Sequence, residues 1–417
     1  MAQETRFIIE ISDDGHLQIP EQLAIQYGLK SGAKLVLEAS QGEIRIQSPI
    51  TRLAKVYIEP TNTCNLGCRT CMRNVWDEPP GFMGEGIFQR ILQGLEAISP
   101  RPVLFFGGFG EPLSHPDIIK MIQQAKALGC RVELISNGIY LSPQMSEELV
   151  STELDTLWVS IDGARPESYA DVRLGAELPQ VIENLKHLRQ LMIRRHQLLP
   201  QLGIAFVAMR RNIKDLPDVL RLGSRLGAAY FSISNVLSYT PELAVEELYE
   251  RSIYSGAYQV SSGIPHISFP RMDAGPDNLA TLVEVLSARY KVSLAGAEIG
   301  NSVNRCPFIY KNSTSIRWDG MLSPCLPLLH THQSYLDDRL RESKEYMLGS
   351  ILEKDLLDLW MGPGYIALRE RLRDFDFSPC TFCNSCEMPD SNLEDCFGSP
   401  APVCGGCLWA QGIIQCP

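Results

Sequence analysis

The sequence predicts an α/β protein whose central part is a partial barrel of six strand–helix units, and three observations support this. Between residues 55 and 234, strand-like apolar runs alternate with helical ones. Alternation at these lengths implies parallel strands joined by right-handed crossovers. A small unit of short strands precedes this part, and nine of the thirteen cysteines follow it, from Cys306 onward. We therefore expect four segments, namely 1–50, 51–240, 241–300 and 301–417.

The first fifty residues form a unit of their own. FIIEI, HLQIP, KLVLEA and EIRIQS have the alternating character of strands, and EQLAIQYG has helical spacing. The pattern DDGHLQIPEQLAIQYGLKSGAKLVLEASQGEIRI resembles the AbrB-like swapped-hairpin domain, which implies a homodimer formed through residues 1–50. That family usually binds DNA through basic residues, but this stretch has four basic and seven acidic residues. Since phosphate contacts dominate DNA affinity, we expect dimerisation or docking of a partner in place of DNA binding.

Strands and helices then follow in alternation. The strands are expected in apolar runs near Lys55–Glu59, Val103–Gly107, Arg131–Ser136, Thr156–Ile161, Gly203–Ala208 and Tyr230–Ser234. The helices are expected between them, near Ile87–Ala97, Pro116–Leu128, Pro143–Leu149, Leu178–Met192 and Lys214–Leu226. Residues 241–300 connect this core to the cysteine-rich part and contain one more helical pattern, around Asp277–Tyr290.

Three cysteines, in the run CNLGCRTC, follow the first of these strands. Cys64, Cys68 and Cys71 have a spacing that fits three corners of a cubane iron–sulfur cluster and leaves the fourth iron open. An open iron binds another molecule and takes part in chemistry. Two alternatives remain, which are three ligands of a zinc site or buried thiols. Structural zinc needs four ligands, and no His or fourth Cys lies near Cys71 in the sequence.

This motif and the strand–helix units after it resemble the radical S-adenosylmethionine (SAM) superfamily. Members of that superfamily are incomplete TIM barrels with the active site at the carboxyl ends of the strands. The resemblance implies a 4Fe-4S cluster that binds SAM, and reductive cleavage of SAM to a 5′-deoxyadenosyl radical that abstracts a hydrogen atom from the substrate. The sequence identifies no general base.

The loops after the second and third strands match the superfamily's SAM-binding elements. In GGFGEP, Gly108 and Gly110 permit close backbone approach, and Glu111 corresponds to the carboxylate that receives the SAM amino group. Asn137 lies in a Ser-Asn-Gly turn where the family often has Thr-Asn-Gly. By themselves, a glycine-rich turn and an Asn-Gly pair indicate only tight turns. One departure is Thr70, because the family often has an aromatic residue before the third cysteine.

The later strands add further candidates. Ser160 and Asp162 share one face of an extended chain, and a paired hydroxyl and carboxylate suit a ribose diol. The alternative is a capped strand end. Arg173, in ESYADVRLGA, corresponds to the guanidinium that pairs with the SAM carboxylate, and a solvated Arg at a helix end is the alternative. Ser232 and Asn235 are weaker candidates for the adenine side.

The carboxyl-terminal third resembles a SPASM domain, the cysteine-rich extension of many radical SAM enzymes. Cys306, Gly320 and Cys325 match its opening spacing, and the later cysteines depart from its pattern. Two fully ligated four-iron clusters need eight thiolates and nine are available, so we expect two auxiliary clusters with ligands among Cys306, Cys325, Cys380, Cys383, Cys386, Cys396, Cys404 and Cys407. The alternative is one cluster with a zinc site or free thiols. Cys130 is expected to be a buried small residue.

Substrate and partners follow from resemblance alone. SPASM-bearing enzymes mostly modify peptides or proteins. The AbrB-like start, the radical SAM core and the tail EDCFGSPAPVCGGCLWAQGIIQCP resemble a narrower group, the radical SAM maturases associated with tungsten-cofactor aldehyde oxidoreductases. This implies a peptide, protein or metallocofactor substrate, a tungsten-dependent oxidoreductase as partner, and an electron donor such as ferredoxin or flavodoxin. Two alternatives stay open, an enzyme acting on a short ribosomal precursor peptide and a metal-sensing DNA-binding regulator.

Composition narrows the class of protein. The net charge of −11 argues against nonspecific attraction to nucleic acid or anionic lipid. No apolar run approaches the ~20 residues needed to cross a bilayer, and MAQETRFIIEISDDG does not have the apolar core of a signal peptide. Thirteen cysteines without a secretion signal favour metal or redox use over a disulfide framework. We therefore expect a cytoplasmic enzyme without membrane contact.

Overall fold

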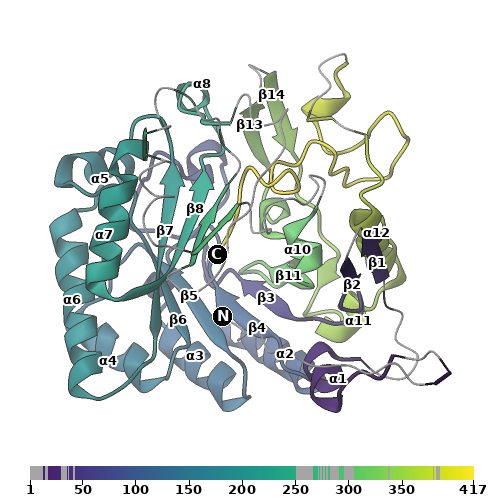
Figure 1. Ribbon diagram of the computed structural model, residues 1–417, viewed down its shortest axis with the longest axis horizontal. Helices are drawn as coiled ribbons and strands as arrows, with labels where there is room; N and C mark the ends of the chain where they lie inside the picture. Colours follow the sequence, from purple (N-terminus) through teal and green to yellow (C-terminus); the bar gives the residue numbers. More distant parts are fainter. Residues whose placement is uncertain are drawn as a thin grey trace.

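The computed structural model describes residues 13–14, 17–29, 35, 37–40, 43–249, 266–270, 272, 275, 278, 280–281, 291–294, 305–336, 339–378, 380–381 and 386–417. In this part of the chain an eleven-stranded sheet forms the centre, in the order β10-β9-β8-β7-β6-β5-β4-β3-β11-β12-β15 (Figure 1). The strands from β10 to β3, and β11 beside them, run parallel. The prediction of a parallel α/β core is therefore confirmed.

The six predicted strands are consecutive neighbours in the middle of this sheet. They are β3 (Lys55–Ile58), β4 (Val103–Phe106), β5 (Val132–Ser136), β6 (Thr156–Ser160), β7 (Gln201–Ala208) and β8 (Ala228–Asn235). Each observed end lies within two residues of the expected one. The prediction succeeded because these strands carry apolar residues that helices cover, such as Val56, Leu104 and Leu134, which are fully buried.

Helices lie between successive strands and cover the outer face of the sheet (Figure 1). Those that the sequence predicted are α2 (Glu85–Glu96), α3 (Ile118–Ala127), α4 (Pro143–Ser151), α6 (Leu178–Arg194) and α7 (Leu216–Leu226). In α7, Val219, Leu220 and Leu226 recur at helical spacing and are all buried. One short helix in this region, α5 (Pro166–Val172), was not predicted, and it lies between β6 and α6.

The sheet extends beyond the predicted strands at both edges. β9 (His266–Phe269) and β10 (Lys291–Leu294) follow β8, in the segment where the sequence indicated only a helix. Of that expected helix, around Asp277–Tyr290, the structure describes only residues 278 and 280–281. At the other edge, β11 (Ser313–Ile316) pairs with β3. Its sequence, STSI, contains no apolar run, yet all four side chains are buried, so its place in the sheet was not visible in the composition.

The cysteine-rich part builds a second unit against this edge. Short strands β12 (Met321–Ser323) and β15 (Gly349–Ser350) extend the sheet in antiparallel fashion, and β13 (His332–Leu336) and β14 (Arg339–Ser343) form a separate hairpin. Three helices belong to this unit, α10 (Pro307–Tyr310), α11 (Leu356–Trp360) and α12 (Pro363–Asp374). The described residues after α12 contain one short 3₁₀ helix, η6 (Met388–Asp390), and otherwise irregular chain.

The segment Ile413–Pro417 lies on the inner side of the barrel, between β8 and β3 (Figure 1). Asn235, the last residue of β8, donates from Nδ2 to Ile413 O at 2.9 Å. Tyr57, in β3, donates from its hydroxyl to Pro417 O at 3.4 Å. The two strands are the outermost of the six central strands and do not pair with each other. The segment therefore links the two sides of the open barrel through side-chain hydrogen bonds.

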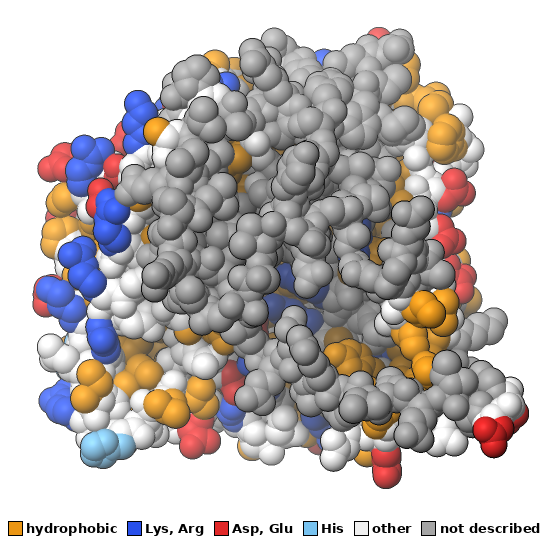
Figure 2. Space-filling model, viewed as in Figure 1, with side chains coloured by type: hydrophobic (Ala, Val, Ile, Leu, Met, Phe, Trp, Pro, Cys, Tyr) orange, Lys and Arg blue, Asp and Glu red, His pale blue; other side chains and the backbone are white. Residues whose placement is uncertain are grey.

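The amino-terminal unit contains α1 (Glu21–Tyr27), followed by β1 (Leu37–Ser40) and β2 (Glu43–Ile46), which form an antiparallel hairpin. The helix and this hairpin agree with expected elements, and the expected strand FIIEI lies outside the described residues. HLQIP, also expected as a strand, forms none in its described residues 17–20, and the AbrB-like resemblance stays a prediction. Figure 2 shows side chains of both charge signs interspersed along the flank formed by α6 and α7. Among the described residues, no helix combines the length and the apolar character that spanning a bilayer requires.

Candidate active site

The three cysteines of CNLGCRTC lie in the loop that follows β3, at the carboxyl end of the sheet. Cys68 is buried, and Cys64 and Cys71 are half-buried. A backbone hydrogen bond from Cys71 N to Cys68 O, 3.1 Å long, turns the loop before the 3₁₀ helix η1 (Met72–Val75). All three cysteines line one cavity of about 200 Å³, together with Leu66, Thr70, Met72, Gly108, Phe109, Gly110, Glu111, Ile135, Ser136, Asn137, Ser160, Arg173 and Tyr239.

The glycine-rich loop after β4 packs directly on this cysteine loop. Glu111 N donates to Thr63 O at 2.8 Å. A Cβ atom at Gly110 would lie 2.1 Å from the carbonyl oxygen of Thr61, and Gly108 has φ +139°. Only glycine allows the backbone at residue 110 to come so close to Thr61 and the backbone at residue 108 to adopt this φ. Both glycines line the cavity, so their backbone atoms are open to a ligand there.

Glu111 and Asn137 hold the carboxyl ends of β4 and β5 together beside the cysteines. The Glu111 carboxylate accepts hydrogen bonds from Asn137 N at 2.8 Å and Leu113 N at 3.0 Å. Burial raises the pKa of this carboxyl group. The Ser136 side chain also hydrogen-bonds to this carboxylate, which has about four acceptor sites, so acceptor capacity remains for a ligand. Asn137 Nδ2 donates to Asn65 Oδ1 at 2.8 Å and lies 3.8 Å from Cys64 Sγ.

Arg173, in the cavity wall, forms a buried ion pair with Asp162. Arg173 Nε donates to Asp162 Oδ2 at 2.5 Å, and its Nη1 lies 3.8 Å from Cys68 Sγ. Burial opposes the Arg173 charge, but the Asp162 carboxylate and the Cys68 sulfur raise its pKa, so the guanidinium stays cationic. The other Asp162 oxygen accepts from Val207 N at 2.7 Å, and Asp162 is fully buried. Arg173 therefore lines the cavity, whereas Asp162 lies behind Arg173.

The remaining expected SAM contacts divide between the cavity and the core. Ser160 and Thr70 line the cavity. Ser232 is buried and does not line it, and Asn235 uses its side-chain amide to hold the segment Ile413–Pro417. Sequence reasoning missed the aromatic residues of the cavity, Phe109 and Tyr239. The first stands inside the glycine-rich motif, but nothing near Tyr239 in the sequence marks it as part of the site.

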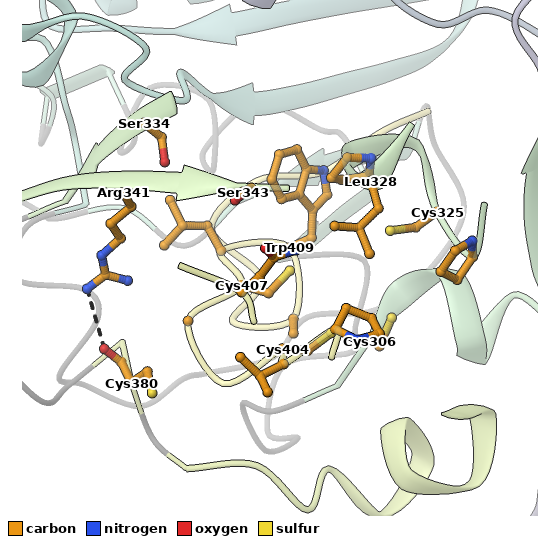
Figure 3. A pocket seen from close by; sticks show the side chains of 18 of the residues that line it. Cys306, Cys325, Leu328, Ser334, Arg341, Ser343, Cys380, Cys404, Cys407 and Trp409 are labelled. Atoms are coloured by element: carbon orange, nitrogen blue, oxygen red, sulfur yellow. Dashed lines mark hydrogen bonds between the residues drawn. The ribbon is translucent and has the colours of Figure 1, made fainter. Parts of the chain in front are cut away.

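A second cavity, of about 100 Å³, lies in the cysteine-rich part, and five cysteines line it (Figure 3). Figure 3 shows Cys306, Cys404 and Cys407 close together with Cys325 to one side, whereas Cys380 lies apart from them. Burial raises the pKa of the Cys306 thiol to about 12, and it also raises the pKa of Cys325, Cys404 and Cys407. Buried thiols of this kind become thiolates when they bind a metal.

Among the described residues, the other expected ligands do not belong to this group of four. Cys386 and Cys396 are exposed and do not line the cavity, and Cys383 lies outside the described residues. Cys380 Sγ lies 2.8 Å from the hydroxyl of the buried Ser378. Cys416 lies inside the barrel, where Lys311 Nζ donates to its carbonyl oxygen at 3.4 Å.

Both cavities have the residues that iron–sulfur clusters require. The first offers three thiols on one loop, with two glycine backbones beside them, and so fits a cluster with one open iron and a ligand next to it. The second offers four neighbouring thiols, as a fully ligated cluster needs. Cys130, by contrast, is buried by itself, and burial raises its pKa to about 11.

Two family models match the chain. Residues 58–222 match the Radical SAM superfamily, and residues 306–387 match SPASM, an iron–sulfur cluster-binding domain. The first match contains the cysteine loop and the glycine-rich loop, and the second contains Cys306, Cys325 and Cys380.

Curated relatives match the chain over different lengths. The chain is 28% identical over 371 residues to the "Tungsten-containing aldehyde ferredoxin oxidoreductase cofactor-modifying protein" of Pyrococcus furiosus, a match that covers 87% of this chain and 96% of that protein. It is 28% identical to the "AdoMet-dependent heme synthase" of Methanosarcina barkeri and 27% identical to "Mycofactocin maturase MftC" of Mycobacterium tuberculosis. These two matches cover 42% and 41% of this chain, and 48% and 41% of those proteins.

Solved structures share the fold. SuiB of Streptococcus suis, bound to the precursor peptide SuiA, superposes with a TM-score of 0.55 at 15% identity, covering 76% of this chain and 67% of SuiB. The AdoMet-bound native anSMEcpe superposes with a TM-score of 0.50 at 13% identity, covering 79% of this chain and 87% of that one. At such low identities the likeness extends to the fold alone.

Proposed function

The chain is a radical SAM enzyme with a carboxyl-terminal SPASM domain, and from this premise we propose that it modifies a metallocofactor, specifically the tungsten cofactor of an aldehyde oxidoreductase. The observation that carries the proposal is the match along nearly the whole chain to the cofactor-modifying protein of Pyrococcus furiosus. The heme synthases and MftC match about two fifths of this chain, so their likeness concerns the barrel that all of them need.

Cys64, Cys68 and Cys71 would hold the SAM-binding cluster. A 4Fe-4S cluster held there would bind SAM and supply the electron for its reductive cleavage. Arg173 binds the SAM carboxylate as a charge-assisted pair, because the guanidinium stays cationic in its buried place. Glu111 accepts hydrogen bonds from the SAM amino group with its remaining acceptor capacity.

The rest of the cavity orients SAM and excludes water. We assign the ribose contact to Ser160, which lines the cavity, and an orienting role to Asp162, which holds the Arg173 guanidinium. The family often has an aromatic residue at the position of Thr70. In this chain Phe109 and Tyr239 contribute aromatic rings to the same cavity. Such a lining keeps water and other quenchers from a reactive radical.

The SPASM domain would hold two auxiliary clusters. We assign Cys306, Cys325, Cys404 and Cys407 to the first, because they line one cavity and lie together. The second would use Cys380 with Cys383, Cys386 and Cys396, and Cys416 would ligate neither cluster. Clusters at these places suit electron transfer to or from a substrate radical, with ferredoxin or flavodoxin as the external donor.

The test begins with protein reconstituted without oxygen. Three 4Fe-4S clusters hold about twelve irons, and the reduced protein should release 5′-deoxyadenosine from SAM. The triple variant Cys64→Ala, Cys68→Ala, Cys71→Ala should lose this release and keep the auxiliary iron. SAM cleavage by the triple variant would contradict the proposal.

The substrate is tested separately. The enzyme, SAM and reductant are incubated with a tungsten-dependent aldehyde oxidoreductase, and the extracted cofactor is examined by mass spectrometry. A mass change that needs SAM supports cofactor modification. A second candidate is modification of a short precursor peptide, because SPASM-bearing enzymes mostly modify peptides or proteins. A SAM-dependent mass change in a co-purified peptide, with none in the cofactor, would replace the first candidate by the second.

A further inference from the structure

A histidine of the SPASM domain is buried next to the SAM cavity, between two carboxylates. His330 Nε2 lies 2.9 Å from Glu59 Oε2, and His330 Nδ1 lies 2.7 Å from Glu78 Oε2. The side chains of His330 and Glu59 are both 0% exposed. The histidine stands just before β13, whereas Glu59 follows β3 and Glu78 belongs to the loop after the cysteines. One imidazole ring therefore connects three segments that are far apart in the sequence.

The Glu59 carboxylate also contacts the glycine-rich loop, so it links His330 to that loop. Its Oε1 accepts a hydrogen bond from Phe109 N at 3.1 Å. A Cβ atom at Gly108 would lie 2.8 Å from Glu59 Cγ, so the two segments are in contact at this point. Gly108 and Phe109 both line the SAM cavity. The position of the Glu59 side chain thus helps to determine the position of the cavity wall.

Aromatic rings enclose the histidine. The Trp76 ring centroid lies 4.0 Å from that of His330, and Phe109 meets His330 edge-on at 5.6 Å. Glu59 and Glu78 face the ring nitrogens of His330, and nearby His332 donates from its Nδ1 to the His330 carbonyl oxygen at 3.1 Å. Burial opposes the charged form of His330, but the two carboxylates raise its pKa to about 9.

We propose that His330 is a positioning residue for SAM, which fixes Glu59 and, through it, the backbone of Gly108 and Phe109. The proposal rests on the SAM site assigned above and deepens it, because the SPASM domain then completes the SAM cavity in addition to holding clusters. Cys325, a candidate cluster ligand, lies in the same short segment as His330.

The experiment measures SAM binding to reconstituted, unreduced protein by equilibrium dialysis, from neutral pH to above the pKa of His330. His330→Gln keeps the size of the side chain and loses the charge. At neutral pH we expect it to bind SAM roughly tenfold more weakly, since hydrogen bonds to charged groups are worth that much. Iron content should not change. His187→Gln, on the outer helix α6, is the matched control and should bind as the wild type does.

The pH profile separates positioning from a general loss of structure. The raised pKa means that the imidazolium is present below about 9 and is lost as the pH rises through that value. Wild-type affinity should fall through this range toward that of His330→Gln, whose own affinity should follow only the titration of SAM. Glu78→Gln removes one of the two carboxylates, so it should move the midpoint of the wild-type fall to lower pH.

Three results would overturn the proposal. Equal SAM affinity of His330→Gln and wild type at every pH would remove the positioning role and leave the SAM site standing. An unchanged midpoint in Glu78→Gln would do the same, and this variant serves if His330→Gln does not fold. Failure of the wild type itself to bind SAM would overturn the proposed function together with this inference.

Discussion

Gly110 and Gly86 differ in what a methyl group would meet at each place. At Gly110 the added carbon would lie 2.1 Å from Thr61 O, whereas at Gly86, in α2, no atom lies within 4 Å. Thr61 begins the loop that carries the three cysteines, so a side chain at position 110 that displaces Thr61 would also displace the candidate cluster site. This single contact explains why the second loop of the barrel needs glycine at that position.

The first prediction compares these two glycines. Gly110→Ala should lower 5′-deoxyadenosine release roughly a hundredfold, because small displacements of a reacting geometry have effects of that size. Gly86→Ala should leave release unchanged and change the free energy of unfolding by less than about 1 kcal/mol, because Gly86 lies in the first turn of α2. Release per reconstituted SAM-binding cluster and urea unfolding measure the two effects. Equal release from both variants would show that the loops do not need this contact.

The segment Ile413–Pro417 acts as an element of the barrel although it is neither helix nor strand. Ile413 is 0% exposed and packs with other buried side chains at the barrel edge, among them Val236 and Leu237. Asn235 and Tyr57 hold its two ends by hydrogen bonds. Because β3 and β8 do not pair, the segment supplies part of the contact that a closed barrel would obtain from strand pairing.

The second prediction concerns this packing. Ile413→Ala should lower the free energy of unfolding by about 2–5 kcal/mol, the usual effect of removing a fully buried side chain. Ile193, on α6, is 62% exposed, so Ile193→Ala should change the free energy of unfolding by less than about 0.5 kcal/mol. Denaturant unfolding of the two variants under the same conditions makes the comparison. Similar losses in both would mean that the segment does not stabilise the barrel.

In the whole molecule, the β1–β2 hairpin carries three exposed apolar residues close together. Leu37 is 57% exposed, Ile44 71% and Ile46 41%, all on the β1–β2 hairpin. An isolated two-stranded hairpin is marginally stable in water. We propose that a second copy of this unit covers these side chains, in agreement with the resemblance of residues 1–50 to a dimerising domain.

The third prediction tests the dimer. The full chain should be dimeric, and deletion of residues 1–46 should give a monomer that still cleaves SAM, because the candidate ligands of the SAM site all lie after residue 60. Light scattering after size-exclusion chromatography measures the mass of each protein. Leu37→Glu should weaken the dimer in the same direction, whereas Glu38→Gln, next to it, should not. A monomeric full chain would contradict the prediction.

Much of the fold and part of the site could be predicted from the sequence, since their signals are local. Each central strand and helix carries its own apolar pattern, and the cysteines of CNLGCRTC and the glycines of GGFGEP stand within a few residues of one another. The sequence pattern gave the wrong expectation where the burial of a residue depends on segments far away in the chain. β11 is made of STSI and is fully buried, and Asp162, on the same face as Ser160 in an extended chain, turns to Arg173 instead of the cavity.

The sequence by itself therefore determined the order of the central strands and helices and the motifs that resemble radical SAM proteins. The tertiary structure alone decided which cysteines lie together, where Ile413–Pro417 runs, and that His330 meets Glu59, 271 residues earlier in the chain. The physical reason is that periodicity and spacing record interactions between near neighbours. Contacts between distant segments arise only when packing brings their surfaces together, and no local sequence pattern predicts them.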